Sequence, residues 1–484
     1  MKKGFRRILF WLIFLLFLIT APAAVLYSQG YRFDHYRMIF IHSGSITVKS
    51  TPSNPSLYVN GTLKPTSNLG IINGSLTVGG LRPGNYDLKI VSNGYSDWEK
   101  KIDVHSGISS EFWNVVLIPQ NPKISQIESH NVGKFYPSPT GKHIAYIERA
   151  DTNFALLSTD VGQNSVNSLY SSSDIFFTDN PKENIEWNSK EDQLLCPIRR
   201  NGNDDYLAAS IGNNSRSEFL SDLSKMTNIV EARWSSRENG VVYFLAKSQN
   251  NLVDLFKFDL SSNKPNLIVS GVATYDLSRD SIYLIRDNNM LYKSDLEGQN
   301  ITQLTSRPFG EEKIADISQF IAYDDDRQVL ITTDGNLYVH NNGLEDFLQK
   351  IGSSVEGAQF SNDGKKLLFW TGNDISVLFL REWDVQPYRE ENEIQSVIRL
   401  ASPVSNVIWY RDYEHIFYSI GNEIRIIELD PRDHRITNDI FQNNLDSFTA
   451  TYNGSKGIYY FLRESDGDPE IFYFNLPEQI GFFG

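Results

Sequence analysis

Residues 135–146 read FYPSPTGKHIAY, and this stretch decides the fold because its pattern returns along the rest of the chain. An aromatic residue ends one apolar run, a polar turn containing Gly follows, and a second apolar run begins. The first and last copies centre on Tyr136 and Tyr452, so seven intervals cover 316 residues, about 45 residues each. That period is typical of a four-stranded propeller blade. The other copies begin at Ile185, Ala232, Ala273, Ile321, Ala358 and Val407.

The repeat predicts an all-β fold in which residues 123–476 form a β-propeller, because a single blade cannot bury both of its faces. Eight copies favour eight blades, and seven stays open because the copy around Tyr323 is weak. The last copy ends one strand short. Residues 123–130 have the pattern of an outer strand, so we expect them to complete the last blade. Residues 477–484 are left as a C-terminal tail.

The turn of the repeat carries a resemblance to a known family. The copy Phe360-Ser-Asn-Asp-Gly-Lys365 resembles the Ser-Pro-Asp-Gly-Lys repeats of TolB-like propellers. The Trp-Asp dipeptide of WD repeats does not recur, since Trp383-Asp384 is a single occurrence. The resemblance implies a TolB-like or WD-repeat-like propeller, and it assigns no activity.

Residues 8–27 form an uncharged apolar run that is long enough to cross a bilayer as a helix. Four basic residues precede it, and basic flanks stay in the cytoplasm. We therefore expect a cytoplasmic tail at residues 1–7, a signal-anchor helix at 8–27 and an extracytoplasmic remainder. A cleaved signal peptide is the alternative, since residues 21–23 read Ala-Pro-Ala. The topology determinants are Lys2, Lys3, Arg6 and Arg7.

Short alternating runs fill residues 44–119, after a juxtamembrane connector at residues 28–43. Asn60-Gly61 is a strong hairpin signal, and Tyr86, Leu88 and Ile90 alternate with charged residues. The segments 47–52, 81–86 and 94–98 resemble the PEGA domain, a small surface-exposed β-sandwich of bacterial and archaeal envelope proteins. The tetrapeptide that names the family is replaced here by a Pro-rich turn at residues 52–56. The resemblance implies surface display and no catalysis.

Composition narrows the choice of partners and compartment. The chain has 484 residues and a net charge of −14. Removing the four basic residues before residue 28 leaves 41 basic against 59 acidic side chains, a net charge of −18. Such a surface repels phosphate backbones, so we predict no nucleic-acid partner. The single cysteine, Cys196, allows no internal disulfide.

The sequence contains no metalloprotease, serine-hydrolase or phosphate-loop motif, and its histidines lack ligand spacing. We therefore predict no catalytic residues and no cofactor. Two acidic clusters remain, at Asp324-Asp325-Asp326 and around residue 466. Both suit polar turns, which is the favoured interpretation. Carboxylates of the second cluster are the weak calcium candidates, namely Asp466, Asp468 and Glu470.

These observations predict a membrane-tethered, extracytoplasmic binding or scaffold protein of the cell envelope. Its propeller would present a face to a protein or glycan partner, with the small β-domain as a spacer. The alternative is a carbohydrate-active hydrolase or lyase with carboxylates on a propeller face. A sensor or assembly subunit is a third possibility, although a seven-residue tail is too short for a cytoplasmic signalling domain.

Overall fold

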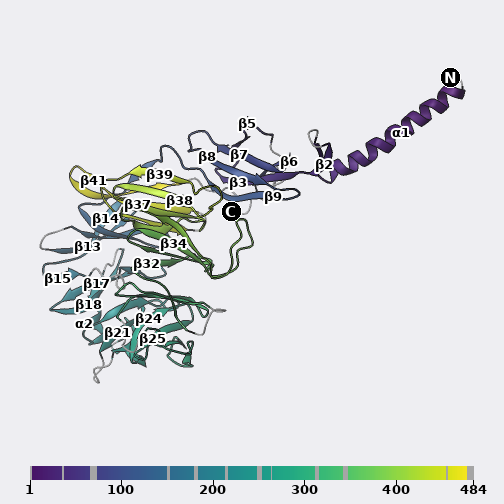
Figure 1. Ribbon diagram of the computed structural model, residues 1–484. Coiled ribbons are helices and arrows are strands. Elements are labelled where there is room, and N and C mark those ends of the chain that lie inside the picture. The colour runs from purple at the N-terminus through teal and green to yellow at the C-terminus, as the bar shows by residue number, and fades with distance from the viewer. Residues whose placement is uncertain are drawn as a thin grey trace.

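The computed structural model describes residues 3–34, 38–65, 74–149, 153–178, 184–212, 216–247, 253–262, 264–310, 316–341, 347–453 and 456–476. Three parts follow one another along the chain: a long helix, a β-sandwich and a ring of sheets (Figure 1). The predicted all-β architecture with one N-terminal helix is confirmed. Lys2 and the tail at 477–484 lie outside the described residues.

The N-terminal helix α1, Lys3–Ser28, stands away from the rest of the molecule (Figure 1). Its segment Leu9–Ser28 has a mean hydropathy of 2.6, and none of it is buried against the protein. An exposed helix this apolar is compatible with a single-pass membrane anchor. A two-stranded ribbon follows it, made of β1, Tyr31–Asp34, and β2, Ile39–His42.

The β-sandwich comes next and is built from two sheets that enclose one core. Residues Ile46, Leu88 and Ile90 are fully buried between the sheets, and Trp98 is 2% exposed. Asn60 and Gly61 both have positive φ in the turn from β4 to β5, as the hairpin signal predicted. One sheet contains β6, Leu76–Leu81, β3, Gly44–Thr51, and β9, Ser109–Val116; the other contains β5, Thr62–Leu63, β4, Ser56–Val59, β7, Gly84–Val91, and β8, Trp98–Val104.

The first four sheets of the ring follow the sandwich in chain order, and we number them one to four. Sheet one contains β11, Val132–Pro137, β12, His143–Glu148, β13, Phe154–Asp160, and β14, Ser165–Ser172. Sheet two contains β15, Ile175–Phe177, β16, Glu186–Trp187, β17, Gln193–Arg200, β18, Asn203–Ser210, and β19, Ser217–Phe219, followed by the short helix α2, Leu220–Ser224. Sheet three contains β20, Val230–Trp234, β21, Val241–Lys247, β22, Val253–Asp259, and β23, Asn266–Ser270. Sheet four contains β24, Val272–Leu277, β25, Ser281–Arg286, β26, Leu291–Asp295, and β27, Thr302–Gln303.

Four further sheets, numbered five to eight, complete the ring. Sheet five contains β28, Ile317–Asp324, β29, Arg327–Thr332, β30, Leu337–Asn341, and β31, Gln349–Gly352. Sheet six contains β32, Val355–Phe360, β33, Lys366–Thr371, β34, Asp374–Phe379, and β35, Ile394–Arg399. Sheet seven contains β36, Ser405–Trp409, β37, His415–Ile420, β38, Glu423–Glu428, and β39, Thr437–Gln442. Sheet eight contains β40, Phe448–Asn453, β41, Lys456–Ser465, β42, Asp468–Asn475, and β10, Ile124–Gln126.

Sheet eight closes the ring with strands from both ends of the propeller sequence. Strand β10 pairs with β42, which is the closure predicted for residues 123–130. Phe135 and Tyr146 of sheet one then share a core with Tyr460 and Leu462 of sheet eight. Each sheet also contacts the next one along the chain. Every sheet of the ring therefore packs against two neighbouring sheets.

The aromatic residue of the repeat has a defined role in this ring. It lies at or near the end of the first strand of most sheets and donates a hydrogen bond to a backbone carbonyl of the preceding sheet. Hydrogen bonds satisfy the polar edge of rings that are otherwise buried. The repeat therefore supplies a link between sheets as well as a strand. The donors and acceptors are Trp187 to Tyr136, Trp234 to Glu186, Tyr275 to Glu231, Trp409 to Gln359 and Tyr452 to Trp409.

Candidate functional site

The first acidic cluster predicted from the sequence lies in the turn between β28 and β29, where basic side chains pair with it. Asp324 is bound by Arg327 of the same turn. Asp325 accepts a hydrogen bond from Lys293 at 2.5 Å, and Asp326 lies 4.0 Å from Arg381. Asp324 and Asp325 are thus ion-paired turn residues, as the favoured interpretation predicted.

The second acidic cluster lies at the tip of the β41–β42 hairpin. Asp466 and Gly467 form the two-residue turn, both with positive φ, and Ser465 pairs with Asp468 across it. Glu470 points to the closing strand, where it accepts a hydrogen bond from Gln126. Within the described ranges, no three His, Cys, Asp or Glu side chains are grouped as metal ligands. Calcium binding by this cluster stays a prediction without a geometric basis.

A cavity of about 350 Å³ lies among the first strands of sheets two to five. It is lined by β16, β20, β24 and β28, and β24 contacts β28 directly. First strands are the innermost strands of a propeller, so this cavity opens toward the ring axis. Its charged lining residues are Glu186, Glu231, Arg233 and Asp276.

Arg233 and Asp276, two of the four charged groups of this axial cavity, are only loosely paired. The Arg233 Nη1 atom lies 4.0 Å from Asp276 Oδ1, longer than a hydrogen-bonded ion pair. Asp276 accepts backbone hydrogen bonds from Leu277 and Ala322, both at 2.9 Å. Glu231 accepts a hydrogen bond from the Thr274 hydroxyl at 2.6 Å. The charges are held in place by backbone and hydroxyl donors, and the arginine is left facing the cavity.

Burial perturbs the acids of the axial cavity. It raises the pKa of Glu186 to about 7, although Arg233 lowers it in part. Burial also raises the pKa of Asp276, again against the opposing charge of Arg233. The pKa of Arg233 is raised because these two carboxylates outweigh the effect of its own burial. A carboxyl group that titrates near neutrality in a cavity can exchange a proton with a ligand.

Sequence reasoning missed these residues, although a signal was present in the repeat. Glu186 and Arg233 each stand one position before the repeat aromatic, where other copies carry Phe135 or Ile408. Side chains alternate along a strand, so this position cannot share the aromatic residue's face. Charged residues at the same repeat position in two neighbouring copies were therefore the available signal.

A second candidate region is the joint between the β-sandwich and sheet seven. Lys100 of β8 has a fully buried side chain, and its Nζ atom lies 2.5 Å from Glu428 Oε1. Trp98 Nε1 donates to Glu428 Oε2 at 3.1 Å. The remaining Lys100 partners are the carbonyl oxygens of Asp430, Arg432 and His434, at 3.0, 3.0 and 2.7 Å.

Further contacts extend this joint along the edge of the sandwich. Arg432 donates to the Glu111 carbonyl at 2.7 Å and lies 3.8 Å above the Phe112 ring. Gln386 exchanges hydrogen bonds with the backbone of β9 at 3.0 and 3.1 Å. Val116 and Ile118 share a core with aromatic residues of sheets seven and eight. The sandwich and the ring are thus in direct contact through hydrogen bonds and a shared apolar core.

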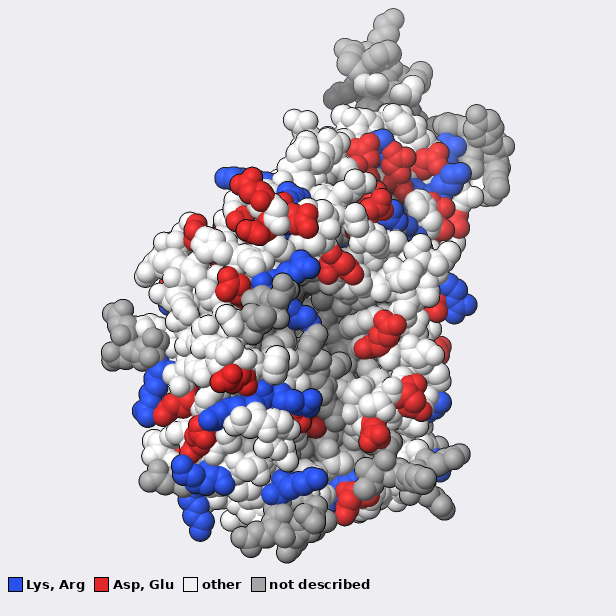
Figure 2. Space-filling model, turned by 90° about the vertical axis from the view of Figure 1, so that its left-hand side faces the viewer, with Lys and Arg blue, Asp and Glu red and all other residues white. Residues whose placement is uncertain are grey.

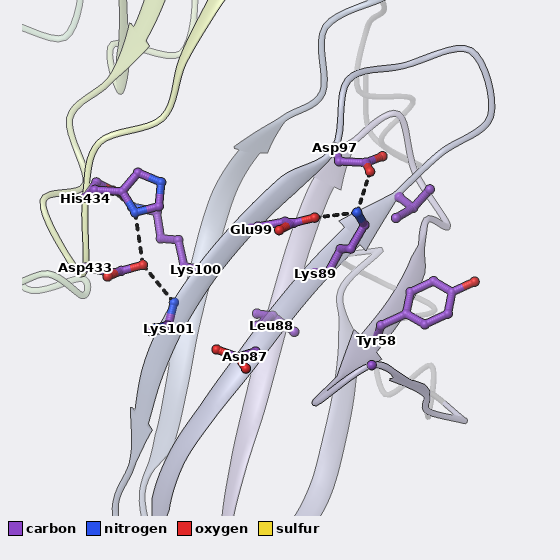
Figure 3. A pocket seen from close by; sticks show the side chains of 12 residues that line it. Tyr58, Asp87, Leu88, Lys89, Asp97, Glu99, Lys100, Lys101, Asp433 and His434 are labelled. Atoms are coloured by element: carbon purple, nitrogen blue, oxygen red, sulfur yellow. Dashed lines mark hydrogen bonds and ion pairs between the residues drawn. The ribbon is translucent and has the colours of Figure 1, made fainter.

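The joint borders a groove of about 660 Å³ on the outer face of the sandwich (Figure 3). Lys89 points into it and pairs with Asp97, at 2.6 Å, and with Glu99. On the propeller side, Asp433 accepts a hydrogen bond from the Lys101 backbone at 2.9 Å. On the face drawn in Figure 2, Lys and Arg side chains are interspersed with Asp and Glu side chains. The groove residues pair with one another, so the axial cavity is the stronger site candidate.

Comparison with known proteins identifies one part of the chain. Residues 43–115 match the PEGA domain family, which confirms the resemblance drawn from the sequence. No curated protein matches the chain.

Solved structures similar to this chain are distant. Saccharomyces cerevisiae Sqt1 is 11% identical with a TM-score of 0.44, over 74% of this chain and 99% of its own. The Myceliophteria thermophila Cps50 (Swd1) β-propeller domain is 11% identical with a TM-score of 0.42, over 73% of this chain and 99% of its own. An oligogalacturonate lyase in complex with manganese is 12% identical with a TM-score of 0.40, over 72% of this chain and 98% of its own. None of these similarities bears on ligand or activity.

Proposed function

We propose that this protein is a membrane-tethered, extracytoplasmic binding scaffold of the cell envelope. The observation that carries the proposal is the fully satisfied burial of Lys100 between sandwich and ring. A buried charge with every partner in place fixes one geometry, because any displacement leaves it unpaired. The ring is therefore held at a set position from the anchor, which suits the display of a binding face.

The layout of the scaffold follows the sequence boundaries. We assign residues 1–7 to the cytoplasm, 8–27 to the membrane, 28–43 to the connector, 44–119 to the sandwich and 123–476 to the propeller. The four basic residues before the apolar run support this orientation. The PEGA match supports an exported sandwich.

The axial cavity is the proposed binding site of the propeller, for a polar group of a protein or glycan partner. Arg233 supplies donors, and Glu186 and Asp276 supply acceptors from neighbouring strands. A binding test uses the full chain in nanodiscs, incubated with envelope fractions before and after protease digestion. Retention on digested fractions identifies a glycan, and retention that protease abolishes identifies a protein.

Matched variants decide whether the cavity is responsible for the retention. Arg233→Gln with Asp276→Asn should abolish it. Arg399→Gln on the outer strand β35, whose side chain is largely exposed, should leave it unchanged. Equal retention by all variants would remove the cavity from the proposal.

A carbohydrate-active hydrolase or lyase is the second candidate function. It is favoured by the Glu186 carboxyl group, whose pKa of about 7 suits a general acid, beside the acidic Asp276. Incubation with envelope polysaccharide tests it through the release of reducing or unsaturated ends. Loss of that release in Glu186→Gln, with binding retained, would establish an enzyme.

A further inference from the structure

The ribbon formed by β1 and β2 exposes large apolar side chains that nothing in the described part of the chain covers, and Ile39 and Phe40 of β2 point to opposite faces of it. Met38, Ile39 and Phe40 are consecutive and are 71%, 50% and 48% exposed. Phe33 packs beside Phe40, with ring centroids 5.2 Å apart. A run of large apolar side chains on a two-stranded ribbon is costly in water and indicates an apolar contact.

The ribbon is attached firmly to the end of helix α1. Arg32 donates to the Tyr27 carbonyl at 3.0 Å, and its guanidinium lies 3.6 Å above the Tyr27 ring. His42 contacts the Gln29 carbonyl at 2.8 Å, and Ser43 donates to the Gly30 carbonyl at 2.6 Å. The Arg32 contact satisfies a carbonyl of the last helical turn, and the other two contacts bind carbonyls just after the helix. The ribbon therefore has a fixed position relative to the anchor.

The ribbon is also held by the sandwich. Ser106 donates to the His42 carbonyl at 3.0 Å. Gly107 has a positive φ, and a Cβ atom there would lie 2.4 Å from the His42 ring. The glycine thus lets the histidine pack directly on the sandwich backbone. Helix, ribbon and sandwich form a continuous chain of close contacts.

We propose that the β1–β2 ribbon rests in the headgroup region of the membrane, with Met38, Ile39 and Phe40 inserted at its boundary with the acyl chains. The lipid that surrounds the anchor covers these side chains on both faces of the ribbon. The candidate span ends at Ser28, and the ribbon begins three residues later, beside the helix end (Figure 1). Apolar and aromatic side chains are stabilised at that depth, and Arg32 can meet anionic headgroups.

This position of the ribbon in the headgroup region, called the ribbon seat below, gives the anchored protein a second point of contact with the bilayer. A single helix leaves its attached domain free to tilt, because tilt is set by packing and interfacial anchors. The ribbon adds an interfacial anchor on one side of the helix. Since the ribbon packs on the sandwich, the bilayer surface then orients the whole ectodomain. The inference rests on the proposed membrane insertion of α1.

Site-specific fluorescence in the full chain tests whether the ribbon lies in the headgroup region. Cys196 is fully buried and burial raises the pKa of its thiol, so it stays unlabelled while an introduced surface cysteine reacts. Met38→Cys and Ile39→Cys are each labelled with the environment-sensitive dye NBD. The matched control is Phe176→Cys on β15, where the native side chain is 66% exposed. Each protein is placed in phosphatidylcholine and phosphatidylglycerol vesicles, with or without lipids carrying a nitroxide at headgroup depth.

The labels at 38 and 39 should emit at shorter wavelength than the control label and lose about twofold more intensity to the headgroup nitroxide. Labels at both positions that match the control label, in protein that floats with the vesicles, would overturn the ribbon seat and leave the anchor intact. Protein that does not float with the vesicles would refute the membrane anchor of the proposed function, and the ribbon seat with it.

Discussion

The sandwich–propeller joint and the axial cavity both hold a basic side chain among carboxylates, and they differ in how completely it is satisfied. Lys100 at the joint has a carboxylate at 2.5 Å and three carbonyl oxygens within 3.0 Å. Arg233 at the axis has an ion pair of 4.0 Å and faces a cavity of about 350 Å³. One group has no remaining hydrogen-bonding capacity, and the other has capacity left for a ligand.

The contrast separates a structural charge from a binding charge by physical means. A buried ammonium group has three donors, and full satisfaction leaves nothing to offer a partner. A guanidinium has five donors, so a single long ion pair leaves most of them for water or a ligand. Removing Lys100 should therefore cost stability, and changing the cavity should alter binding and pH response.

The largest expected effect is that of Lys100→Met. The variant leaves Glu428 buried without its counter-charge, which costs roughly 3–5 kcal/mol in comparable cases. We expect a drop of that size in the free energy of unfolding, measured by urea denaturation of the full chain in detergent. Lys101→Met is the matched control, since its side chain is exposed. Equal stability of both variants would contradict the role of the joint.

A double variant sharpens this test with a smaller effect. Glu428→Gln retains a carbonyl that can accept from Trp98 or Ile436, and it removes the charge. Lys100→Met with Glu428→Gln should therefore be more stable than Lys100→Met alone, by about 0.5–3 kcal/mol. The measurement is a double-mutant cycle in urea. Strict additivity would show that the two side chains are not coupled.

The free energy of unfolding should depend on pH through Glu186 of the axial cavity. The folded protein holds the Glu186 proton more tightly than the unfolded chain, because the pKa rises from 4.5 to about 7. The free energy of unfolding should thus fall as pH rises through this window. Glu186→Gln should remove the fall and exceed the native protein in stability at pH 8. Parallel profiles of melting temperature from pH 4.5 to 8 for the two proteins would contradict the assignment.

The smallest expected effect concerns calcium. Asp466 and Asp468 lie at a hairpin tip, and no three His, Cys, Asp or Glu side chains of the described residues are grouped as metal ligands. We expect millimolar calcium to leave the melting temperature unchanged, in the native protein and in Asp466→Asn alike. A rise in the native protein that Asp466→Asn abolishes would restore the calcium site.

The architecture could be predicted from the sequence because the same pattern of strand and turn residues recurs many times. Tyr136, Trp187 and Trp409 mark equivalent strands, and the closing strand β10 was visible as an unmatched copy of an outer strand. The PEGA segment was found from its turns, and its match confirms it. Local chemistry decides these features, so local patterns reveal them.

The sites depend on contacts between distant parts of the chain and were not predicted. Lys100 looks like one charge in an alternating strand, and only tertiary packing places it against Glu428, more than 300 residues later. Arg233 and Asp276 meet because neighbouring first strands approach the axis. The repeat position shared by Glu186 and Arg233 was an available signal, but it does not give the distance between their side chains. The loosely paired cavity residues also follow no motif.

The closing strand β10 has a mechanical consequence for a tethered protein. Ile124–Gln126 pairs with β42, and Ile127 and Ser129 add two hydrogen bonds to Ile471, so a pull delivered through the chain between sandwich and ring would act on few bonds. The contacts of Lys100 and Arg432 transmit the pulling force to sheet seven instead. Tension between the membrane and a ligand held by the propeller is then shared by many bonds at once. The joint therefore shields the pairing of β10 with β42 from a force that acts through the membrane anchor.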